Sequence, residues 1–290
     1  MSNPRGKLYI VATPLGNLGD MSARAIEVLN SVDIIYAEDT RHSGPLLHHY
    51  GIKPPCHALH DHNERAVAGE VCERLAGGAR LALISDAGTP LISDPGYVLV
   101  REAHAVGLTV SPIPGPSSVI AALSVSGLPT DRFIFEGFLP AKGHGRKQRL
   151  SELARETRTL VFFEGPHRFL DTLTDLVDVF GPDREATLAR ELTKMHETVR
   201  KSTLSQMLEW VRQDSNQQRG EIVLVVAGCA RISDESEAEA ERVLKVLVAD
   251  LPIKQAAALA AKLTGASKNK LYDLALQWRQ DASDETDETG

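Results

Sequence analysis

The chain has 290 residues, of which 42% are hydrophobic and 24% charged, and it carries a formal net charge of −7. Such a chain is longer than one typical domain and can bury sizeable cores, whereas its apolar runs fall short of the roughly 20 residues of a membrane-spanning helix. Its first residues lack a signal-peptide pattern and its three cysteines lack a C-x-x-C spacing, so we expect a soluble, cytoplasmic protein without a disulfide framework or zinc site.

Short β-branched runs alternate with helical patterns over residues 1–138. Strands are expected at 7–12, 32–37, 80–85, 108–113 and 132–137. Helices are expected at 22–30, 45–50, 64–76, 95–106 and 117–126. Pro95 suits the first position of the fourth helix, Ser93 or Asp94 suits its cap, and Gly107 suits its end. The alternation predicts an α/β domain with a parallel sheet.

A change of composition follows this domain. Residues 139–150 are rich in glycine and basic side chains and predict a basic linker. The alternation then restarts, with strands expected at 159–164, 185–190 and 221–228, an extended segment at 197–203, and helices at 169–180 and 204–213. We therefore expect a second α/β domain over residues 151–229.

The remaining sequence has a helical pattern. Breaks at Pro252 and Gly265 divide residues 230–280 into a helical appendage of three helices, and residues 281–290 form an acidic tail. Two acidic runs, 234–241 and 281–289, hold five acids each. Subtracting these 10 from the 39 acids leaves 29 against 32 bases, so the folded body is mildly basic and an RNA partner is not excluded.

The turns of the first domain predict a small-molecule pocket. Neither G-x-G-x-x-G nor G-x-x-x-x-G-K-[ST] occurs, so the usual phosphate-binding fingerprints are missing. Instead, turns rich in Gly, Pro, Ser and Thr follow predicted strands at residues 13–20, 85–96 and 114–118. Ligands of open α/β sheets bind outside the carboxyl ends of the strands, where glycine lets the backbone approach closely. Together these turns indicate one site.

Several segments carry a family resemblance. They are TPLGNLGDMSARA (13–25), AEDTRHSGPLL (37–47), HDHNE (60–64), SDAGTPLISDPG (85–96), PIPGPSSVIAAL (112–123), FFEGPHR (162–168), RELTKMHE (190–197) and RGEIVLVVAG (219–228). In this order they resemble the motif series of the ribosomal RNA small subunit methyltransferase I family, which has the tetrapyrrole methylase fold. The resemblance spans residues 7–228, and its most specific part is GTPLISDPG. Gly165 departs from it, because a serine is expected at that position.

The resemblance implies a fold and an activity. The fold is that of a class III methyltransferase, with two α/β domains, the cofactor cleft between them, and a homodimer as the usual assembly. The activity is transfer of a methyl group from S-adenosylmethionine to the ribose 2′-hydroxyl of a cytidine in small-subunit ribosomal RNA, either alone or in the assembled subunit. By matching positions, the cofactor-binding residues would be Leu15, Asp86, Ala87, Gly88, Thr89, Ser117, Ser118, Phe163 and Ile222.

The pattern Leu-Ile-Ser-Asp-x-Gly occurs twice, at residues 83–88 and 91–96. The first copy ends a strand and turns the backbone through Asp86 toward the predicted cofactor. The second copy places Ser93 and Asp94 at the start of a helix, where a carboxylate is favourable, so we interpret Asp94 as a cap.

Catalytic side chains are expected in AEDTRHS, which offers Glu38, Asp39, Arg41 and His42 directly after a strand. A sulfonium methyl group is already activated, so the protein mainly aligns the acceptor oxygen, and a base or cation assists the weakly acidic ribose hydroxyl. We expect Asp39 to act as base or orienting carboxylate and Arg41 to contact phosphate or substrate. The alternative is an Asp39–Arg41 ion pair that only holds the loop.

The segment HDHNE has three interpretations. His60, His62 and Glu64 could hold a metal, could contact the substrate, or could simply precede and begin a helix capped at Asn63. Methyl transfer from a sulfonium needs no metal, so we expect none.

For RNA, the basic patch at Lys142, Arg146, Lys147 and Arg149 suits phosphate contacts, and the alternative is a solvated linker. Aromatic residues make up only 5% of the chain, which argues against extended base stacking.

Two other functions stay open. The chain could be another methyltransferase of the same fold, acting on a tetrapyrrole or a modified histidine, although AEDTRHS and GTPLISDPG argue against this. It could also be a non-catalytic RNA-binding or ribosome-assembly module, which a titration with S-adenosylmethionine would separate from an enzyme.

Overall fold

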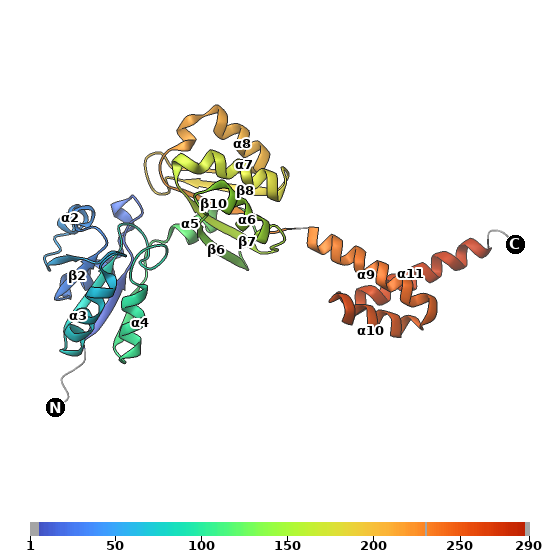
Figure 1. The fold of residues 1–290 in the computed structure, drawn as a ribbon, viewed down its shortest axis with the longest axis horizontal. Helices are drawn as coiled ribbons and strands as arrows, with labels where there is room; N and C mark the ends of the chain where they lie inside the picture. Colours follow the sequence, from blue (N-terminus) through green and yellow to red (C-terminus); the bar gives the residue numbers. More distant parts are fainter. Residues whose placement is uncertain (1–5, 230, 288–290) are drawn as a thin grey trace. The chain divides into compact units, whose positions relative to one another are not determined.

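A computed structural model describes residues 6–229 and 231–287, and the side chains of 6–229 and 239–279 (Figure 1). The chain divides into two compact units. The first unit contains two β-sheets, and the second contains three C-terminal helices together with residues 151–158. Among the described helices, none combines the length and the apolar character that crossing a membrane requires.

The first sheet is parallel throughout and has the strand order β3-β2-β4-β1-β5. Its strands are β1 (Lys7–Val11), β2 (Ile34–Ala37), β3 (Cys56–Ala58), β4 (Arg80–Ile84) and β5 (Thr109–Ile113). This parallel α/β sheet confirms the prediction made from the alternating pattern.

Helices cover both faces of the first sheet. They are α1 (Ala23–Ser31), α2 (Thr40–His49), α3 (Glu64–Ala76) and α4 (Tyr97–Ala105). Leu29 of α1 and Leu47 of α2 pack with Val11 on one face, whereas Val71 of α3 and Leu99 of α4 pack with Leu8 on the other. Burial on both faces explains why these strands are nearly continuous apolar runs.

The second sheet is mixed and has the order β6-β7-β10-β8-β9. Its strands are β6 (Phe133–Phe138), β7 (Thr159–Glu164), β8 (Glu185–Arg190), β9 (Thr198–Thr203) and β10 (Ile222–Val226). Only the β6–β7 pair is parallel, and the remaining pairs are antiparallel. Strand β6 was expected in the first domain, so the expected boundary at residue 138 is wrong. The reason is that pairing between β6 and β7 is set by contacts distant in sequence, which a local pattern does not reveal.

The helices of the second sheet are α5 (Ser118–Val125), α6 (Gly143–Leu153), α7 (Phe169–Phe180) and α8 (Leu204–Gln213), with short 3-10 turns at Leu18–Asp20, Pro166–Arg168 and Ser215–Gln218 in the same unit. Val119 and Leu123 of α5 pack on Val161 and Val223 of the sheet. Helix α8 begins with a capping box formed by Thr203 and Gln206.

Helix α6 replaces most of the expected basic linker at 139–150. Arg146 of this helix is 5% exposed and its Nε lies 2.7 Å from Oδ2 of Asp175 in α7. The order of this segment therefore comes from tertiary ion pairs, which its glycine-rich composition did not predict.

The second unit contains α9 (Arg231–Asp250), α10 (Ile253–Thr264) and α11 (Lys268–Asp287). The three helices and the breaks at Pro252 and Gly265 confirm the expected appendage. Leu244, Ala257 and Leu271, one from each helix, share a core of their own. The acidic run 234–241 lies within α9 and does not form a separate connection. The expected acidic tail is helical as far as Asp287, and residues 288–290 lie outside the described residues.

Candidate active site

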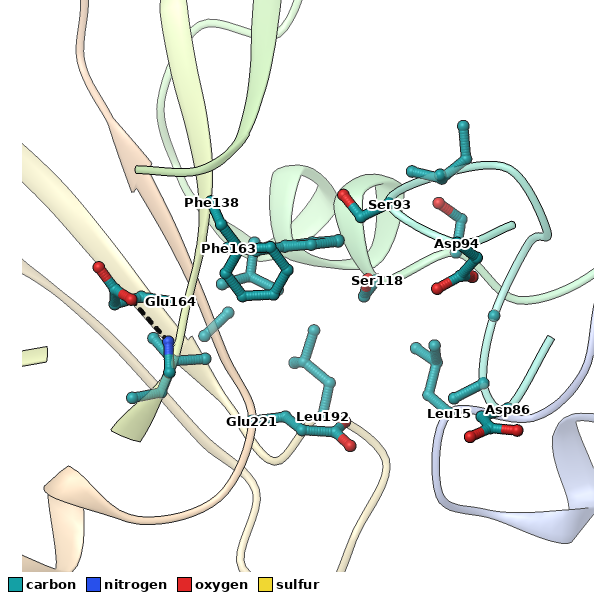
Figure 2. A pocket seen from close by; sticks show the side chains of 18 of the residues that line it. Leu15, Asp86, Ser93, Asp94, Ser118, Phe138, Phe163, Glu164, Leu192 and Glu221 are labelled. Atoms are coloured by element: carbon teal, nitrogen blue, oxygen red, sulfur yellow. Dashed lines mark hydrogen bonds between the residues drawn. The ribbon is translucent and has the colours of Figure 1, made fainter. Parts of the chain in front are cut away.

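A pocket of about 410 Å³ opens in the first unit. One side is formed by the loop after β4 and the start of α5, and the other by residues of β7 and β10 (Figure 2). Figure 2 shows Leu15, Asp86 and Asp94 on one side of the cavity and Phe163, Leu192 and Glu221 on the other. The pocket lies where the carboxyl ends of β1 and β4 meet, as expected for an open α/β sheet.

The predicted cofactor residues converge on this pocket. All nine line it, namely Leu15, Asp86, Ala87, Gly88, Thr89, Ser117, Ser118, Phe163 and Ile222. Their contact with a cofactor stays a prediction, but their convergence from segments far apart in the sequence is a property of the fold.

The loop after β4 is held in an unusual backbone conformation. Gly88 has φ +81°, and its N–H and C=O exchange hydrogen bonds of 3.0 and 2.8 Å with Thr13. The hydroxyl of Thr89 donates to Pro116 O at 2.9 Å, which ties the loop to the segment before α5. Leu91 and Ser93 also have positive φ, 73° and 67°, a conformation that is uncommon for residues other than glycine. The loop therefore presents a fixed backbone surface to the pocket.

Asp94 is not the cap of α4. The helix begins at Tyr97 after Gly96, which makes no side-chain capping hydrogen bond. The cap comes from α3, because Leu99 N donates to Glu64 Oε1 at 3.0 Å. Pro95 therefore lies before the helix, and the expected role of Ser93 or Asp94 is wrong. Asp94 instead lines the pocket, and Gly107, with φ +69°, follows the end of the helix as expected.

Three carboxylates gather on this side of the pocket, those of Glu38, Asp86 and Asp94. Burial, and then the charges of Asp94 and Asp86, raise the pKa of Glu38 to about 7. Burial also raises the pKa of Asp94 to about 6, against the opposing effect of a hydrogen bond with Ser85. Asp61 adds to the repulsion at both groups. A cation bound among these carboxylates would relieve the repulsion.

Asp39 and Arg41 form the ion pair that was considered as the alternative to catalysis. Arg41 Nη2 lies 2.7 Å from Asp39 Oδ2, and Arg41 N donates to Asp39 Oδ1 at 2.8 Å, which caps α2. These hydrogen bonds from Arg41 hold the pKa of Asp39 well below its usual range, which makes Asp39 a weak base. Neither residue lines the pocket, but Asp39 N donates to Asp86 Oδ1 at 3.3 Å. Asp39 therefore contacts the loop after β4 through its backbone.

The opposite side of the pocket is mainly apolar. Phe163, Leu192 and Val223 are among its apolar side chains, and sequence reasoning missed the last two. Glu164 is 3% exposed, and its carboxylate accepts from Gly165 N, Thr172 Oγ1 and Arg168 Nη2. Gly165 has φ −81° and open space around an added Cβ, so the serine expected there would fit this backbone.

Glu38, Asp94, Leu192 and Glu221 are pocket residues that the sequence did not single out for this role. A signal existed for the first two, since Glu38 directly follows strand β2 and Asp94 repeats the pattern of Asp86. No local signal distinguished Leu192 or Glu221 from ordinary loop residues.

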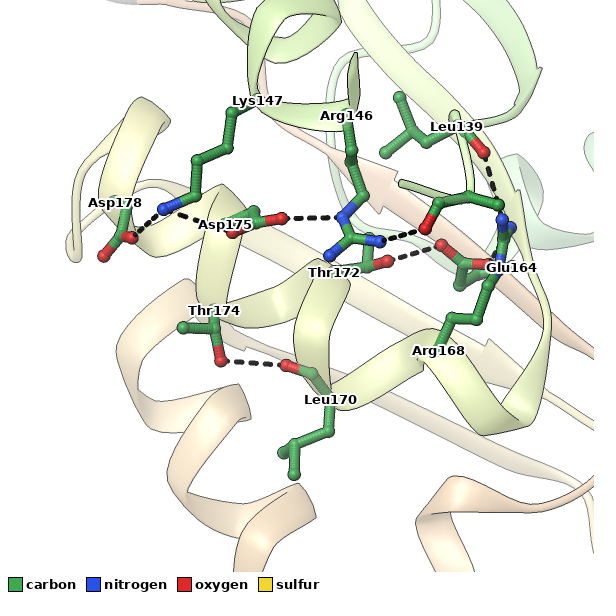
Figure 3. Close-up of polar contacts among 11 residues, drawn as sticks. Leu139, Arg146, Lys147, Glu164, Arg168, Leu170, Thr172, Thr174, Asp175 and Asp178 are labelled. Atoms are coloured by element: carbon green, nitrogen blue, oxygen red, sulfur yellow. Dashed lines mark hydrogen bonds and ion pairs between the residues drawn. The ribbon is translucent and has the colours of Figure 1, made fainter. Parts of the chain in front are cut away.

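The basic patch is largely engaged in ion pairs (Figure 3). Arg146 pairs with Asp175 in the interior, so its expected role in binding RNA is wrong. Lys147 pairs with Asp178 at 2.8 Å, and Arg149 pairs with Glu136 at 2.7 Å. Lys142 is exposed, and no ion pair of its side chain is recorded within residues 6–229 and 239–279. Of the four predicted residues, Lys142 is therefore the most accessible to a phosphate.

The segment HDHNE leads into α3, which begins at Glu64, but the helix cap expected from Asn63 is wrong. Asn63 precedes the helix, and its Oδ1 accepts from His60 N at 2.8 Å instead of capping α3. The ring centroids of His60 and His62 are 6.0 Å apart. The carboxylate of Glu64 accepts the hydrogen bond from Leu99 N. Within the described part of the chain, no group of three His, Cys, Asp or Glu side chains is placed to hold a metal ion.

Known proteins match the chain in both sequence and fold. The sequence model of the family described as Tetrapyrrole (Corrin/Porphyrin) Methylases matches residues 7–208, and that of the RsmI C-terminal HTH domain matches residues 234–279. Ribosomal RNA small subunit methyltransferase I of Pseudomonas aeruginosa is 57% identical over 274 residues, which cover 94% of this chain and 97% of that protein.

Solved structures of the same fold are more distant. The methyltransferase CobJ has a TM-score of 0.57 at 19% identity, covering 78% of this chain and 95% of CobJ. The uroporphyrin-III C-methyl transferase from Thermus thermophilus, complexed with S-adenyl homocysteine, has a TM-score of 0.53 at 17% identity, covering 78% of this chain and all of that one. These likenesses confirm the expected fold. The chain belongs to the tetrapyrrole methylase family and, within it, to the ribosomal RNA small subunit methyltransferase I family.

Proposed function

We propose that the protein transfers a methyl group from S-adenosylmethionine to the ribose 2′-hydroxyl of a cytidine in small-subunit ribosomal RNA. The observation that carries this proposal is the convergence of all nine expected cofactor residues on one pocket, in a chain 57% identical to a protein named ribosomal RNA small subunit methyltransferase I. The solved relative complexed with S-adenyl homocysteine adds support for the cofactor.

The pocket suits S-adenosylmethionine in size and in charge. A volume of about 410 Å³ lies within the range of sites for small ligands and cofactors. Phe163, Leu192 and Ile222 offer an apolar surface for an adenine ring, and Glu38, Asp86 and Asp94 offer negative charge for a sulfonium. When bound, the cofactor supplies an electrophilic methyl group on a positively charged sulfur.

Glu38 is the base that this geometry favours in place of Asp39. It lines the pocket, and its pKa of about 7 lies near the working pH, where a carboxylate accepts a proton most usefully. We propose that its carboxylate takes the proton of the ribose hydroxyl as the oxygen attacks. Asp39 orients the loop by its hydrogen bond to Asp86, and Arg41, 89% exposed, contacts a phosphate of the RNA.

The assembly and the RNA contact are further parts of the proposal. The family resemblance implies a homodimer, and Ile120 and Val125 of α5 are exposed apolar side chains that such an interface could cover. Lys142 supports contact with the RNA backbone, as described above. We further propose the cytoplasm, where small-subunit RNA is found in bacteria, as the place of action.

The test uses small ribosomal subunits from a strain that lacks this protein. The purified protein and S-adenosylmethionine should introduce one 2′-O-methylcytidine, located by mass spectrometry of the digested RNA. Asp39→Asn should retain most of the rate, whereas Glu38→Gln should lower the single-turnover rate by roughly 100-fold. A methyl group on a base, or methylation of a porphyrin in its place, would contradict the proposal. Failure to bind S-adenosylmethionine would favour a non-catalytic module.

A further inference from the structure

Strand β6 contains a bulge beside the pocket. The register of β6 against β7 shifts between Phe135 and Gly137, so Glu136 is an extra residue in the strand. Gly137 has φ +65°, a conformation that glycine adopts without strain and that many bulges require. Arg149 of α6 fixes the extra residue, since its Nη2 lies 2.7 Å from Glu136 Oε2.

The bulge reverses the direction of Phe138. Successive side chains of a regular strand alternate between faces, so residues three apart point in opposite directions. With one extra residue between them, Phe135 and Phe138 both reach Phe163. Their ring centroids lie 4.8 and 5.6 Å from that of Phe163, in edge-to-face arrangements. Three of the seven phenylalanines therefore gather at this place.

Phe138 differs from its two neighbours in exposure. It lines the pocket, yet 57% of its surface is exposed, whereas Phe135 and Phe163 are half-buried. A single exposed apolar side chain is ordinary on a protein surface. The bulge turns the ring of Phe138 toward the pocket, and the ring stays exposed there. It can therefore contact a ligand that lies outside the cavity.

A nucleobase must lie close to this place if the proposed function holds. The base and the 2′-hydroxyl are bonded to neighbouring ribose carbons, so a hydroxyl that reaches the methyl donor leaves its base a few ångströms away. A cavity of about 410 Å³ lies near the lower end of the range for small-ligand sites, which leaves little room for a base beside the donor. The base therefore lies at the mouth of the pocket.

We propose that Phe138 is the ring on which the target cytosine stacks. This inference rests on the proposed function and specifies how that site holds its substrate. Proteins that recognise unpaired RNA, and enzymes that modify a single nucleotide, commonly stack the extruded base on an aromatic side chain. The low aromatic content argues against an extended platform, but one target nucleotide needs only one ring.

The experiment compares three variants of the full-length protein on the unmodified small subunits described above. Phe138→Leu keeps an apolar side chain without the ring, and Phe138→Tyr keeps the ring. The matched control is Phe133→Leu, because Phe133 is on the same strand, 38% exposed, and outside the pocket lining. Three quantities are measured: kcat/KM for the subunit, the Kd of S-adenosylmethionine by calorimetry, and the sedimentation coefficient.

Phe138→Leu should lower kcat/KM about tenfold or more, mainly through KM, whereas Phe138→Tyr should stay within about threefold of the wild type. Phe133→Leu should leave all three quantities unchanged. Normal kcat/KM in Phe138→Leu would overturn the proposal. A parallel rise in the Kd of S-adenosylmethionine would also overturn it, by assigning the ring to the cofactor. A changed sedimentation coefficient would do so by assigning the ring to an interface between two copies of the chain.

The experiment distinguishes failure of the proposed methyl transfer from failure of the stacking role of Phe138. If the wild type and Phe133→Leu transfer no methyl group to the small subunit, the proposed function falls and the stacking role falls with it. If the wild type is active and Phe138→Leu is equally active, only the stacking role is lost.

Discussion

Glu64 of α3 caps α4, because its Oε1 accepts a hydrogen bond of 3.0 Å from Leu99 N. The carboxylate is buried, with 5% of the residue exposed, and it satisfies one of the backbone N–H groups at the start of the helix. A cap supplied by another helix leaves Asp94 available to the pocket. The hydrogen bond therefore joins two helices, and the carboxylate that caps α4 is a different one from the carboxylate that lines the pocket.

Replacing Glu64 should cost stability. Glu64→Ala leaves Leu99 N without its acceptor in the interior, so we expect a loss of about 1–2 kcal/mol in the free energy of unfolding, measured by urea denaturation. The control is Glu70→Ala on the same helix, which removes an exposed ion pair with Arg74 and should cost at most about 0.5 kcal/mol. Equal losses in the two variants would show that the cap contributes nothing specific.

Cofactor affinity should depend on pH. The pKa values of about 7 for Glu38 and about 6 for Asp94 mean that both carboxylates gain protons as the pH falls from 8 to 5. Protonation removes the negative charge that attracts a sulfonium, so the affinity for S-adenosylmethionine should fall over this range in calorimetric titrations. S-adenosylhomocysteine, whose sulfur is uncharged, is the matched ligand.

The change with pH should be clearly smaller for S-adenosylhomocysteine. Glu38→Gln should flatten the dependence near pH 7, and Asp94→Asn should flatten it near pH 6. Identical pH profiles for the two ligands would mean that these carboxylates do not interact with the sulfonium.

The loop after β4 should not accept a side chain at Gly88. This residue has φ +81°, and an added Cβ would lie 3.2 Å from Leu15 Cδ2. Gly88→Val should therefore weaken S-adenosylmethionine binding at least tenfold, or about 1.4 kcal/mol, in a protein that remains folded. Gly44→Ala is the control, because Gly44 lies in α2, has open space around it, and does not line the pocket. Unchanged affinity in Gly88→Val would remove the loop from the binding site.

Substitution of Arg146 should affect stability, whereas substitution of Lys142 should affect RNA binding. Arg146→Ala removes the 2.7 Å ion pair of the buried Asp175, which keeps only Lys147 Nζ at 3.3 Å, and should destabilise the protein by about 1.5–3 kcal/mol. Lys142→Ala should leave the unfolding free energy unchanged and lower the slope of log affinity against log salt for RNA by about 1. A stable Arg146→Ala protein with weakened RNA binding would restore Arg146 to the RNA surface.

The C-terminal helices should be dispensable for cofactor binding. They have their own core, and every pocket residue precedes residue 228. A chain ending at Arg231 should remain folded and keep its affinity for S-adenosylmethionine, yet methylate the small subunit poorly, with a defect that grows as salt is raised. Loss of cofactor binding would give these helices a structural role, and a full rate of methylation would exclude a role in docking on RNA.

The sequence was informative where structure depends on neighbouring residues. The ends of α7 and α8, the capping box at Thr203 and the turn at Gly88 all follow from local patterns. The assignment of β6 to the second sheet and the order of α6 depend on contacts with β7 and Asp175. These partners are distant in sequence, so no local signal could supply them.

The sequence does not show which of Glu38 and Asp39 is the better candidate for the base, and the reason is different. The two carboxylates are adjacent in sequence, and both are plausible bases by residue type. Glu38 points into a pocket shared with Asp86 and Asp94, whereas Asp39 turns toward Arg41. Only the direction of each side chain separates a carboxylate with a raised pKa from one with a lowered pKa.

The three carboxylates of the pocket also affect how its charge changes during the reaction. In the proposed reaction the sulfur loses its positive charge in the same step in which Glu38 gains a proton from the ribose. The pocket therefore keeps the same net charge before and after the transfer, and no uncompensated charge is created in its interior. Once transfer is complete, Asp86 and Asp94 no longer face a cation, and the protonated Glu38 must release its proton to solvent before it can act as a base again. If the proposed reaction is correct, the spent cofactor should be held less firmly than the fresh one, which would favour exchange over product inhibition.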